Sequence, residues 1–342
     1  MTETIAAPSP ITARGSDFAR LADRVRQAGL LERRPAYYAV RIGLVVAAYA
    51  GAWAAFALLG DSWFQLLVAA ALAVVFAQVA LVAHDLAHRQ VFAKRGPSEV
   101  AGMIAGNLGI GMSYGWWMDK HTRHHANPNH EEHDPDVSPD ILIWSEDQAR
   151  TATGVARRVG RVQAYIFFPL LLLEGLNLHV SGARALRRGG QRHRAAEIVL
   201  FAAHVLGYFA AVFAVLPAGK AIAFMAVHQA LFGLYLGCTF APNHKGMPMA
   251  TDDLDYLRKQ VLTSRDVRGG GILDVALGGL NHQIEHHLFP SMASVNLRKA
   301  KPLVRDFCAE IGVAYHETGL VESYSIALRH LHRVGAPLRR RA

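Results

Sequence analysis

Long apolar runs alternate along the chain with polar, basic segments. Four runs are each about twenty residues long, which at a rise of about 1.5 Å per residue matches a hydrocarbon core of about 30 Å. They cover residues 42–60, 63–83, 198–219 and 221–243. Only a short polar turn at Asp61 separates the first two runs, and a turn at residues 217–220 separates the other two. The pattern therefore predicts two tight hairpins of membrane-spanning helices.

Shorter apolar segments lie outside these runs. Residues 97–115 are largely apolar and glycine-rich but short for a span, so we expect an interfacial or re-entrant segment. Residues 162–180 have borderline length and are interrupted by Pro169 and by polar residues, so we expect a helix that lies at the membrane surface. Before the first span, Ser16 is a suitable N-cap for an amphipathic helix that continues to Leu31.

Composition and charge agree with a membrane protein. The 342 residues are 52% hydrophobic, which is too apolar for an ordinary soluble domain. Lys and Arg number 36 against 27 Asp and Glu. Almost all of the basic residues fall outside the spans. By the positive-inside rule, the segments outside the two hairpin turns face the cytoplasm, which predicts a multi-pass protein of the cell (inner) membrane. The excess charge suits anionic membrane lipids, and we expect no nucleic-acid partner, because no nucleic-acid-binding fold accompanies it.

The expected fold is therefore all-α, with four transmembrane helices in two hairpins and a cytoplasmic helical cap. We expect a cytoplasmic N-terminal segment at residues 1–37 and a membrane domain with its cap at 38–300. A basic cytoplasmic C-terminal segment follows at 301–342.

Three histidine clusters carry the candidate chemistry. They comprise His84 and His88, then His121, His124 and His125, and finally His286 and His287. Residues three or four apart share one face of a helix, so each of the first two clusters can direct several imidazoles at one point. Neutral imidazole is a ligand for iron, zinc and copper. Seven such side chains exceed the needs of one tetrahedral zinc, so the spacing indicates a site for two metal ions.

Two further residues are candidate metal ligands. Pro242 breaks the fourth span where it reaches the interface, which places His244 at the depth of the first cluster. Gln283 begins the third cluster and can bind weakly or hold a metal-bound water, and His282 is the next candidate. The carboxylates expected to hold ligand N–H groups are Asp85, Asp266, Asp274 and Glu285. The candidate aromatic residues for a substrate channel wall are Tyr114, Trp116, Trp117 and Trp144.

The remaining histidines are given other roles. His204 and His228 lie within spans, far from the metal end, and are expected to form packing or tunnel hydrogen bonds. His130 and His133 are expected at the surface or at a substrate entrance. His179 is a weaker candidate for contact with the metal ligands. Four others lie among basic residues and are expected to be solvated: His193, His316, His330 and His332.

The motifs H-x-x-x-H, H-x-x-H-H and Q-x-x-H-H, in this order and among paired spans, resemble those of the membrane-bound fatty acid desaturases. The third motif is similar to that of the acyl-lipid and front-end branch. The resemblance implies two iron ions held by histidines, with dioxygen as co-substrate, and removal of two hydrogens from an acyl chain carried on coenzyme A or on a lipid. It also implies a separate electron donor of ferredoxin or cytochrome b5 type with its reductase, because the His-Pro-Gly-Gly motif of a fused cytochrome b5 domain does not occur.

Two alternatives remain open at this point. A di-iron hydroxylase or ketolase that acts on an alkyl, sphingoid or carotenoid chain would use the same scaffold. The sequence does not decide whether the substrate loses two hydrogens or gains oxygen. A metal transporter belongs to another class, because intramembrane histidines can mark an ion pathway. It would need polar residues through the depth of several spans, whereas the clusters are predicted at one face.

Overall fold

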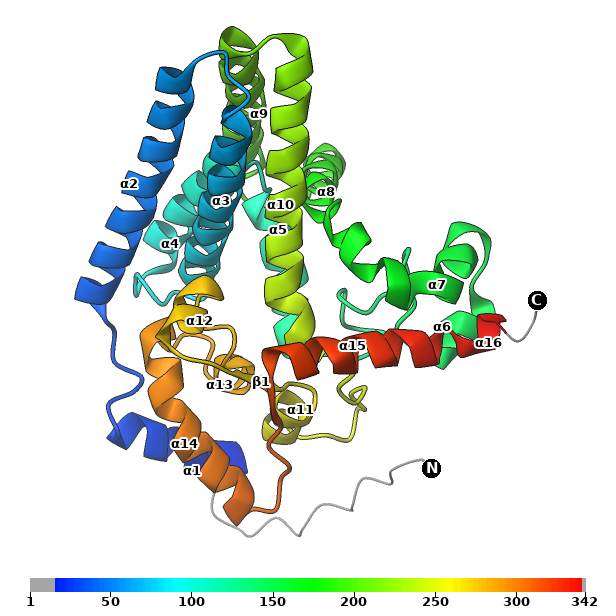
Figure 1. Cartoon of the computed structure of the whole chain (residues 1–342). Helices are drawn as coiled ribbons and strands as arrows, with labels where there is room; N and C mark the ends of the chain where they lie inside the picture. The colour runs from blue at the N-terminus through cyan, green and yellow to red at the C-terminus, as the bar shows by residue number, and fades with distance from the viewer. Residues whose placement is uncertain (1–15, 340–342) are drawn as a thin grey trace.

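Four long helices form the upright part of the molecule (Figure 1). The computed structural model describes residues 16–339. The long helices are α2 (Pro35–Leu59), α3 (Gln65–Ala87), α9 (Arg194–Val215) and α10 (Ala218–His244). Each is long and apolar enough to cross a membrane. The four predicted spans are therefore confirmed, although the first helix begins earlier than its apolar run and the last continues to His244.

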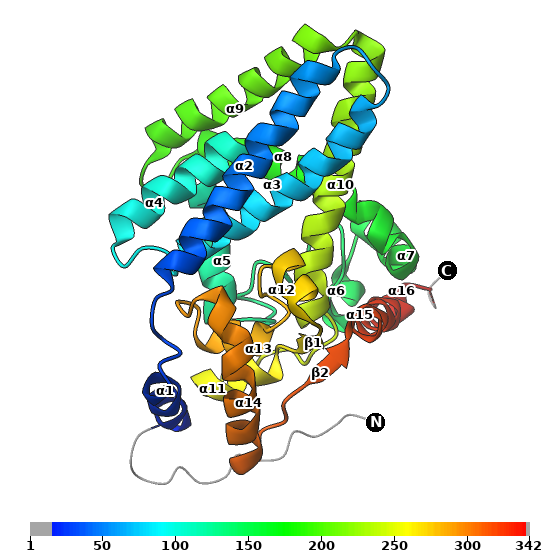
Figure 2. The same cartoon turned by 60° about the vertical axis from the view of Figure 1, so that its left-hand side comes forward.

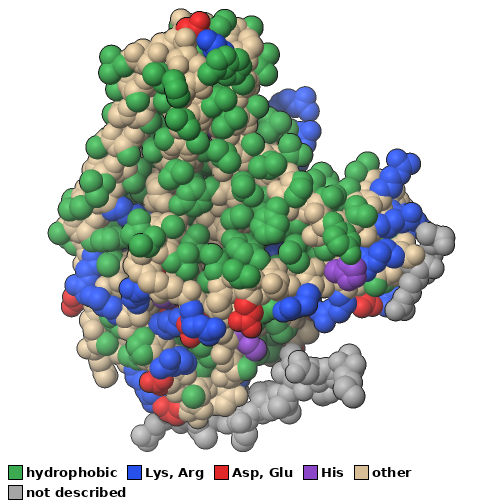
Figure 3. Space-filling view, in the orientation of Figure 1, with side chains coloured by type: hydrophobic (Ala, Val, Ile, Leu, Met, Phe, Trp, Pro, Cys, Tyr) green, Lys and Arg blue, Asp and Glu red, His purple; other side chains and the backbone are tan. Residues whose placement is uncertain are grey.

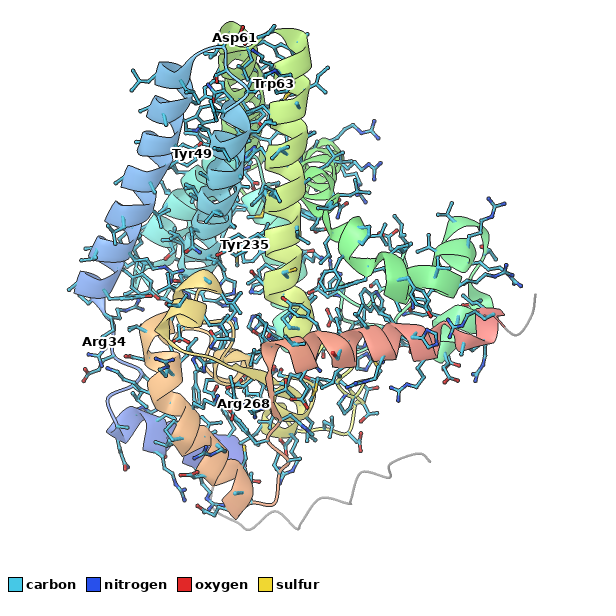
Figure 4. All side chains as sticks on the ribbon, viewed as in Figure 1. Arg34, Tyr49, Asp61, Trp63, Tyr235 and Arg268 are labelled. Atoms are coloured by element: carbon cyan, nitrogen blue, oxygen red, sulfur yellow. The ribbon has the colours of Figure 1, made fainter. Side chains whose placement is uncertain are left out.

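The two hairpin turns meet at one end of this bundle. Gly60 ends α2 with a φ of 61°, which is a conformation that glycine adopts without strain. The Lys220 ammonium lies 2.8 Å from an Asp61 carboxylate oxygen and so joins the first turn to the second. Figure 4 shows Asp61 and Trp63 at this end and Arg34 and Arg268 near the other. Both turns therefore lie at the same end of the bundle, as the hydrophobic pattern predicts.

The bundle has an apolar outer face and a packed interior. Large apolar side chains of α2, such as Leu44 and Leu58, are exposed, and hydrophobic side chains cover the upper part of the molecule (Figure 3). Inside, Phe76 of α3 packs among Phe224 and Phe232 of α10. An exposed apolar surface of this extent suits contact with lipid rather than with water.

The segment expected to be interfacial or re-entrant folds beside the bundle. It comprises α4 (Arg95–Met103) and the π-helix η1 (Ile104–Gly109), which contact α3 and α9. The chain turns at Gly111, whose φ is 65°, and α5 (Tyr114–Ala126) follows. This turn aims α5 at the end of α3, where the first histidine cluster lies.

One expected element is wrong in its shape. Residues 162–180 do not form one straight interfacial helix, because α7 (Gly154–Leu171) and α8 (Glu174–Arg188) meet at an angle of 86°. Pro169 lies in the last turn of α7, where it weakens helical hydrogen bonding. Beyond the bend, α8 packs closely against α10, and a Cβ at Gly233 would lie only 2.5 Å from the Gly175 nitrogen.

A helical cap covers the other end of the bundle (Figure 2). Its helices are α1 (Asp17–Gln27), α6 (Glu146–Thr151), α11 (Tyr256–Leu262), α12 (Gly271–Ala276), α13 (Gln283–Leu288), α14 (Ser294–Glu310), α15 (Leu320–Val334) and α16 (Ala336–Arg339). The Ser16 hydroxyl accepts a hydrogen bond from Ala19 N and caps α1, as predicted. Two short strands, β1 (Asp266–Arg268) and β2 (Glu317–Gly319), pair in parallel. The fold is thus α-helical apart from this small pair.

Candidate metal centre

Four elements bring the histidines together where the bundle meets the cap. The last turn of α3 carries His84, and His88 is its C-cap. Helix α5 supplies the second cluster, α13 supplies the third, and His244 is the last residue of α10. All eight of these predicted histidines fall into two adjacent groups, each compact enough to surround one ion.

The first group contains five imidazoles, and we call it the five-histidine group. Its members are His84, His88, His121, His125 and His286, and one ring nitrogen of each lies within 4.8 Å of the others. His88 Nε2 lies 2.8 Å from His121 Nε2, and His125 Nε2 lies 3.2 Å from His286 Nε2. Both ring nitrogens of His84 are buried without a hydrogen-bond partner. Burial, followed by repulsion from neighbouring imidazoles, holds the pKa of His121 and His286 well below the ordinary value.

The second group contains three imidazoles, and we call it the three-histidine group. Its members are His124, His244 and His287. Each has its Nδ1 held from outside. His124 Nδ1 lies 3.0 Å from an Asp134 carboxylate oxygen. His244 Nδ1 donates to the Thr263 carbonyl at 3.0 Å, and His287 Nδ1 donates to Gln260 Oε1 at 2.9 Å. These contacts leave the Nε2 lone pairs directed inward, which is the usual arrangement of metal-binding histidines.

Electrostatics distinguish one member of this group. Burial lowers the pKa of His124, but Asp134 and Asp136 outweigh burial and raise its pKa above the ordinary value. A carboxylate partner of this kind also increases the basicity of an imidazole toward a metal ion. The two groups adjoin at His125 and His287, whose rings stack with centroids 4.2 Å apart.

The donor set fits a pair of metal ions. Imidazole nitrogens bind such ions at about 2.0–2.1 Å, so the ligands of one ion lie within about 4 Å of one another. The observed clustering within 4.8 Å is close to that requirement. An ion in the five-histidine group would also satisfy one of the two buried ring nitrogens of His84 that have no hydrogen-bond partner.

Gln283 lies beside the three-histidine group. Its Nε2 is 2.9 Å from His244 Nε2, and its Oε1 accepts a hydrogen bond from Asn243 at 3.1 Å. His282 points elsewhere, and its Nε2 lies 3.1 Å from an Asp274 oxygen. His282 instead forms a separate buried group with Asp266 and Glu285. Metal binding by Gln283 stays a prediction, as does the ligand role of each histidine.

Most of the carboxylates that were expected to hold the N–H groups of the metal-centre histidines have other partners in the structure. Asp85 lies 3.6 Å from His84 Nδ1 but forms its close ion pair with Arg41, at 2.6 Å. Asp266 accepts hydrogen bonds from the Ile284 backbone and from Tyr315, which also contacts Glu285. The partners that sequence reasoning missed are Asp134, Gln260 and the Thr263 carbonyl. Only Asp134, ten residues after His124 in an acidic stretch, gave a signal that could have been used.

The candidate wall residues separate into different places. Trp117 stacks on His121 with ring centroids 4.4 Å apart, so it flanks the five-histidine group. Trp116 packs against the bundle interior, and Tyr114 is buried against Gly102. The Trp144 ring lies under the Lys245 ammonium, 4.2 Å from it. Trp117 therefore remains the candidate with direct contact to the centre.

The other histidines largely follow expectation. His204 Nδ1 donates to the Leu108 carbonyl, and His228 Nδ1 lies 2.8 Å from the Tyr208 hydroxyl, so both are hydrogen-bonded inside the bundle. His179 Nδ1 donates to the Gly175 carbonyl, away from the centre. Three of the four histidines expected to be solvated are exposed: His193, His316 and His332.

Two further expectations concern His130 and His330. His133 is exposed as expected, whereas His130 is buried; its Nε2 lies 3.2 Å from an oxygen of the exposed Asp252, and its ring stacks on His133. The expectation for His330 is wrong, because this side chain is half-buried rather than solvated. Its Nε2 donates to the Trp144 carbonyl at 2.9 Å, since the face of α15 that carries it lies against the segment that contains Trp144. Burial lowers the pKa of His330 to about 4, so its ring is neutral near pH 7.

Comparison with known proteins agrees with this geometry. Residues 61–319 match the fatty acid desaturase family. The chain is 31% identical to an acyl-lipid (9-3)-desaturase of Physcomitrium patens over 93% of its length, and it spans 62% of that protein. It is 27% identical to a Delta(8)-fatty-acid desaturase of Euglena gracilis, covering 92% of this chain and 78% of the relative. It is also 27% identical to fatty acid desaturase 3 of Bos taurus, covering 93% of this chain and 73% of the relative. The chain belongs to the fatty acid desaturase family.

Proposed function

We propose that this protein is a membrane fatty acyl desaturase that uses two iron ions and dioxygen to remove two hydrogens from an acyl chain. The observation that carries the proposal is the pair of adjoining imidazole groups at the cap end of four apolar helices. Family membership supports the same reaction. Iron with dioxygen supplies the oxidant that an unactivated C–H bond requires, because protein side chains offer none.

The chain's own residues would hold and shield this chemistry. The five-histidine group would hold one ion. The three-histidine group would hold the other, with Gln283 as a weak ligand or as the holder of a bound water. Asp134, Gln260 and the Thr263 carbonyl would keep the Nε2 atoms directed at the second ion. The three-histidine group is fully buried, whereas His88, His121 and His125 are half-buried. The Trp117 ring would form part of the wall against which the chain is positioned.

The arrangement in the membrane is part of the proposal. The cap and both termini would face the cytoplasm, and the hairpin turns at Asp61 and Lys220 would face the opposite side. The parts proposed are the terminal segment 1–37, the membrane domain 38–300 and the basic segment 301–342. Electrons would come from a separate ferredoxin or cytochrome b5-type protein and its reductase, which the cap could reach from the cytoplasm.

Lipid mass spectrometry after expression in a heterologous host tests the activity. Loss of two mass units from an acyl chain supports a desaturase, whereas a gain of sixteen supports a hydroxylase of the same scaffold. An unchanged lipid profile from a metal-loaded protein with its electron donor would contradict both. His88→Ala, His125→Ala and His287→Ala should abolish product, and the exposed His332→Ala serves as the control.

A further inference from the structure

A surface hollow leads from helix α15 toward the three-histidine group. The outer part has a volume of about 360 Å³ and is lined by Gly246, Ile326, Arg329, His330 and Arg333. A smaller inner space of about 10 Å³ shares Gly246 and His330 with it and reaches His244. The outer part alone has the size of a small-molecule binding site. The two spaces therefore adjoin, and His244 forms part of the wall of the inner one.

Two arginines give the outer hollow a positive charge. Arg329 and Arg333 are one helical turn apart, so they share a face of α15. Both are exposed, and neither forms an ion pair with a carboxylate of residues 16–339. The residues that line the outer hollow include no acidic side chain. Two guanidinium groups on one concave wall thus lack a counter-charge.

His330 connects this charged wall to the inner space. Its Nε2 donates to the Trp144 carbonyl, which leaves Nδ1 free to accept. The Arg333 Nη2 atom lies 3.5 Å from that Nδ1, so the guanidinium lies beside the ring. Gly246, with a φ of 88°, passes so close to α15 that a Cβ there would lie 2.8 Å from Ile326 Cγ2. The wall is therefore held in place on both sides.

The inner space has one apolar and adaptable side. Its apolar side is formed by Met247, Met249, Val137 and Trp144, and its polar side includes Asn129 and Lys245 as well as His244 and His330. Its volume equals roughly one water molecule, so an acyl chain would pass only if these walls move. Unbranched methionine side chains repack readily, which allows such movement. A positive mouth with the side chains of Met247, Met249 and Val137 behind it matches a ligand with an anionic head and an apolar chain.

We propose that Arg329 and Arg333 bind the phosphate of the substrate's carrier group while the acyl chain extends past Met247 toward His244. The inference rests on the proposed function. Guanidinium forks match phosphate oxygens bidentately, and they do so without being deprotonated. The phosphate can belong to coenzyme A or to a phospholipid headgroup, because both present the same chemistry. A concave site of this volume favours such a headgroup over the convex surface of an electron-carrier protein.

The test measures equilibrium binding to the purified full-length protein. The probes are oleoyl-CoA against oleate, and dioleoyl phosphatidylglycerol against dioleoylglycerol, so that each pair differs by its phosphate-bearing group. The variants are Arg329→Gln and Arg333→Gln. The matched control is Arg158→Gln, because Arg158 is exposed on α7, forms no ion pair within residues 16–339 and lines neither space. Unchanged metal content and elution volume verify that each variant is folded.

Each hollow variant should weaken binding of one phosphate-bearing probe about tenfold, the usual effect of losing a hydrogen bond to a charged group. Oleate, dioleoylglycerol and the control should be unaffected, and the probe that responds identifies the carrier. Wild-type affinity of both variants for both phosphate probes would overturn the proposal. So would a loss restricted to binding of a reduced ferredoxin, which would assign the surface to the electron donor. Because binding is measured without turnover, a protein that binds in this way but forms no double bond would contradict the proposed function alone.

Discussion

The rings of His125 and His287 stack almost in parallel, with centroids 4.2 Å apart and planes 13° from each other. His125 belongs to the five-histidine group, whereas His287 belongs to the three-histidine group. The contact therefore lies between the two proposed ion sites. Because α5 carries residues of both groups, as does α13, a shift of either helix would disturb the two sites together. The centre is thus one unit with two unequal halves.

Because the two groups differ in their ligands, we predict that the ion of the three-histidine group can be lost while the other ion stays bound. His244 contributes to the three-histidine group alone and is supplied by α10 alone. His244→Ala should lower bound iron from about two ions to about one per chain and remove activity, because two imidazoles hold an ion poorly. Metal analysis of the purified protein measures this. His228→Ala, more than four helical turns away along α10, should retain both ions. Full iron and turnover in His244→Ala would mean that another residue completes the site.

A second prediction concerns Asp134, which contacts His124 Nδ1 from outside the centre. Asp134→Asn keeps the size of the side chain but removes the charge that raises the basicity of the imidazole. Loss of such a partner typically weakens metal binding about 10- to 100-fold. Metal titration of the apoprotein should show this loss for one ion only. Asp252→Asn is the control, because Asp252 is exposed and contacts His130 rather than a member of either group. Equal weakening of both ions would contradict the division into two halves.

The sequence predicted the parts of this centre whose signals are local. Spans follow from about twenty apolar residues in a row, and clusters such as His121, His124 and His125 follow from helical spacing. His244 was predictable because Pro242 marks the end of its helix. Contacts made by distant segments left no local signal. The Thr263 carbonyl and Gln260 are examples, since neither residue type nor spacing indicates that they face His244 and His287.

The same reason explains the two corrections to the predicted fold. The bend between α7 and α8 depends on how closely α8 approaches α10 at Gly175, which a hydrophobic pattern does not contain. The sequence predicts a solvated His330 because its neighbours in sequence are basic, yet the face of α15 that carries it lies against the segment that contains Trp144. The pair of strands β1 and β2 is only three residues long on each side, too short for a periodic pattern to be recognised.

A third prediction tests the close approach of α8 and α10. At Gly233 a Cβ would lie 2.5 Å from Gly175 N and 2.7 Å from the Leu171 carbonyl oxygen, and backbone cannot move aside easily. Gly233→Ala should therefore lower the free energy of unfolding by about 1–3 kcal/mol through overpacking. Thermal unfolding in detergent measures the change. Gly207→Ala in α9 is the matched control, because no atom lies within 4 Å of its added Cβ. Equal stability of both variants would show that the helices are not held at this distance.

The last prediction concerns sidedness, for which the ion pair between Asp61 and Lys220 supplies the starting point. Because this pair joins both hairpin turns, reporters inserted at Ser62 and at Ala218 should be found on the same side of the membrane. The positive-inside rule places that side outside the cytoplasm, and a reporter at the C-terminus should then be cytoplasmic. A reporter after Arg150 should match the C-terminal one, since the bent pair α7 and α8 turns by 86° and need not cross. Opposite readings at Arg150 and at the C-terminus would make the bent pair a fifth span. That result would place the second and third histidine clusters on opposite sides of the membrane, and it would contradict their convergence on one metal centre.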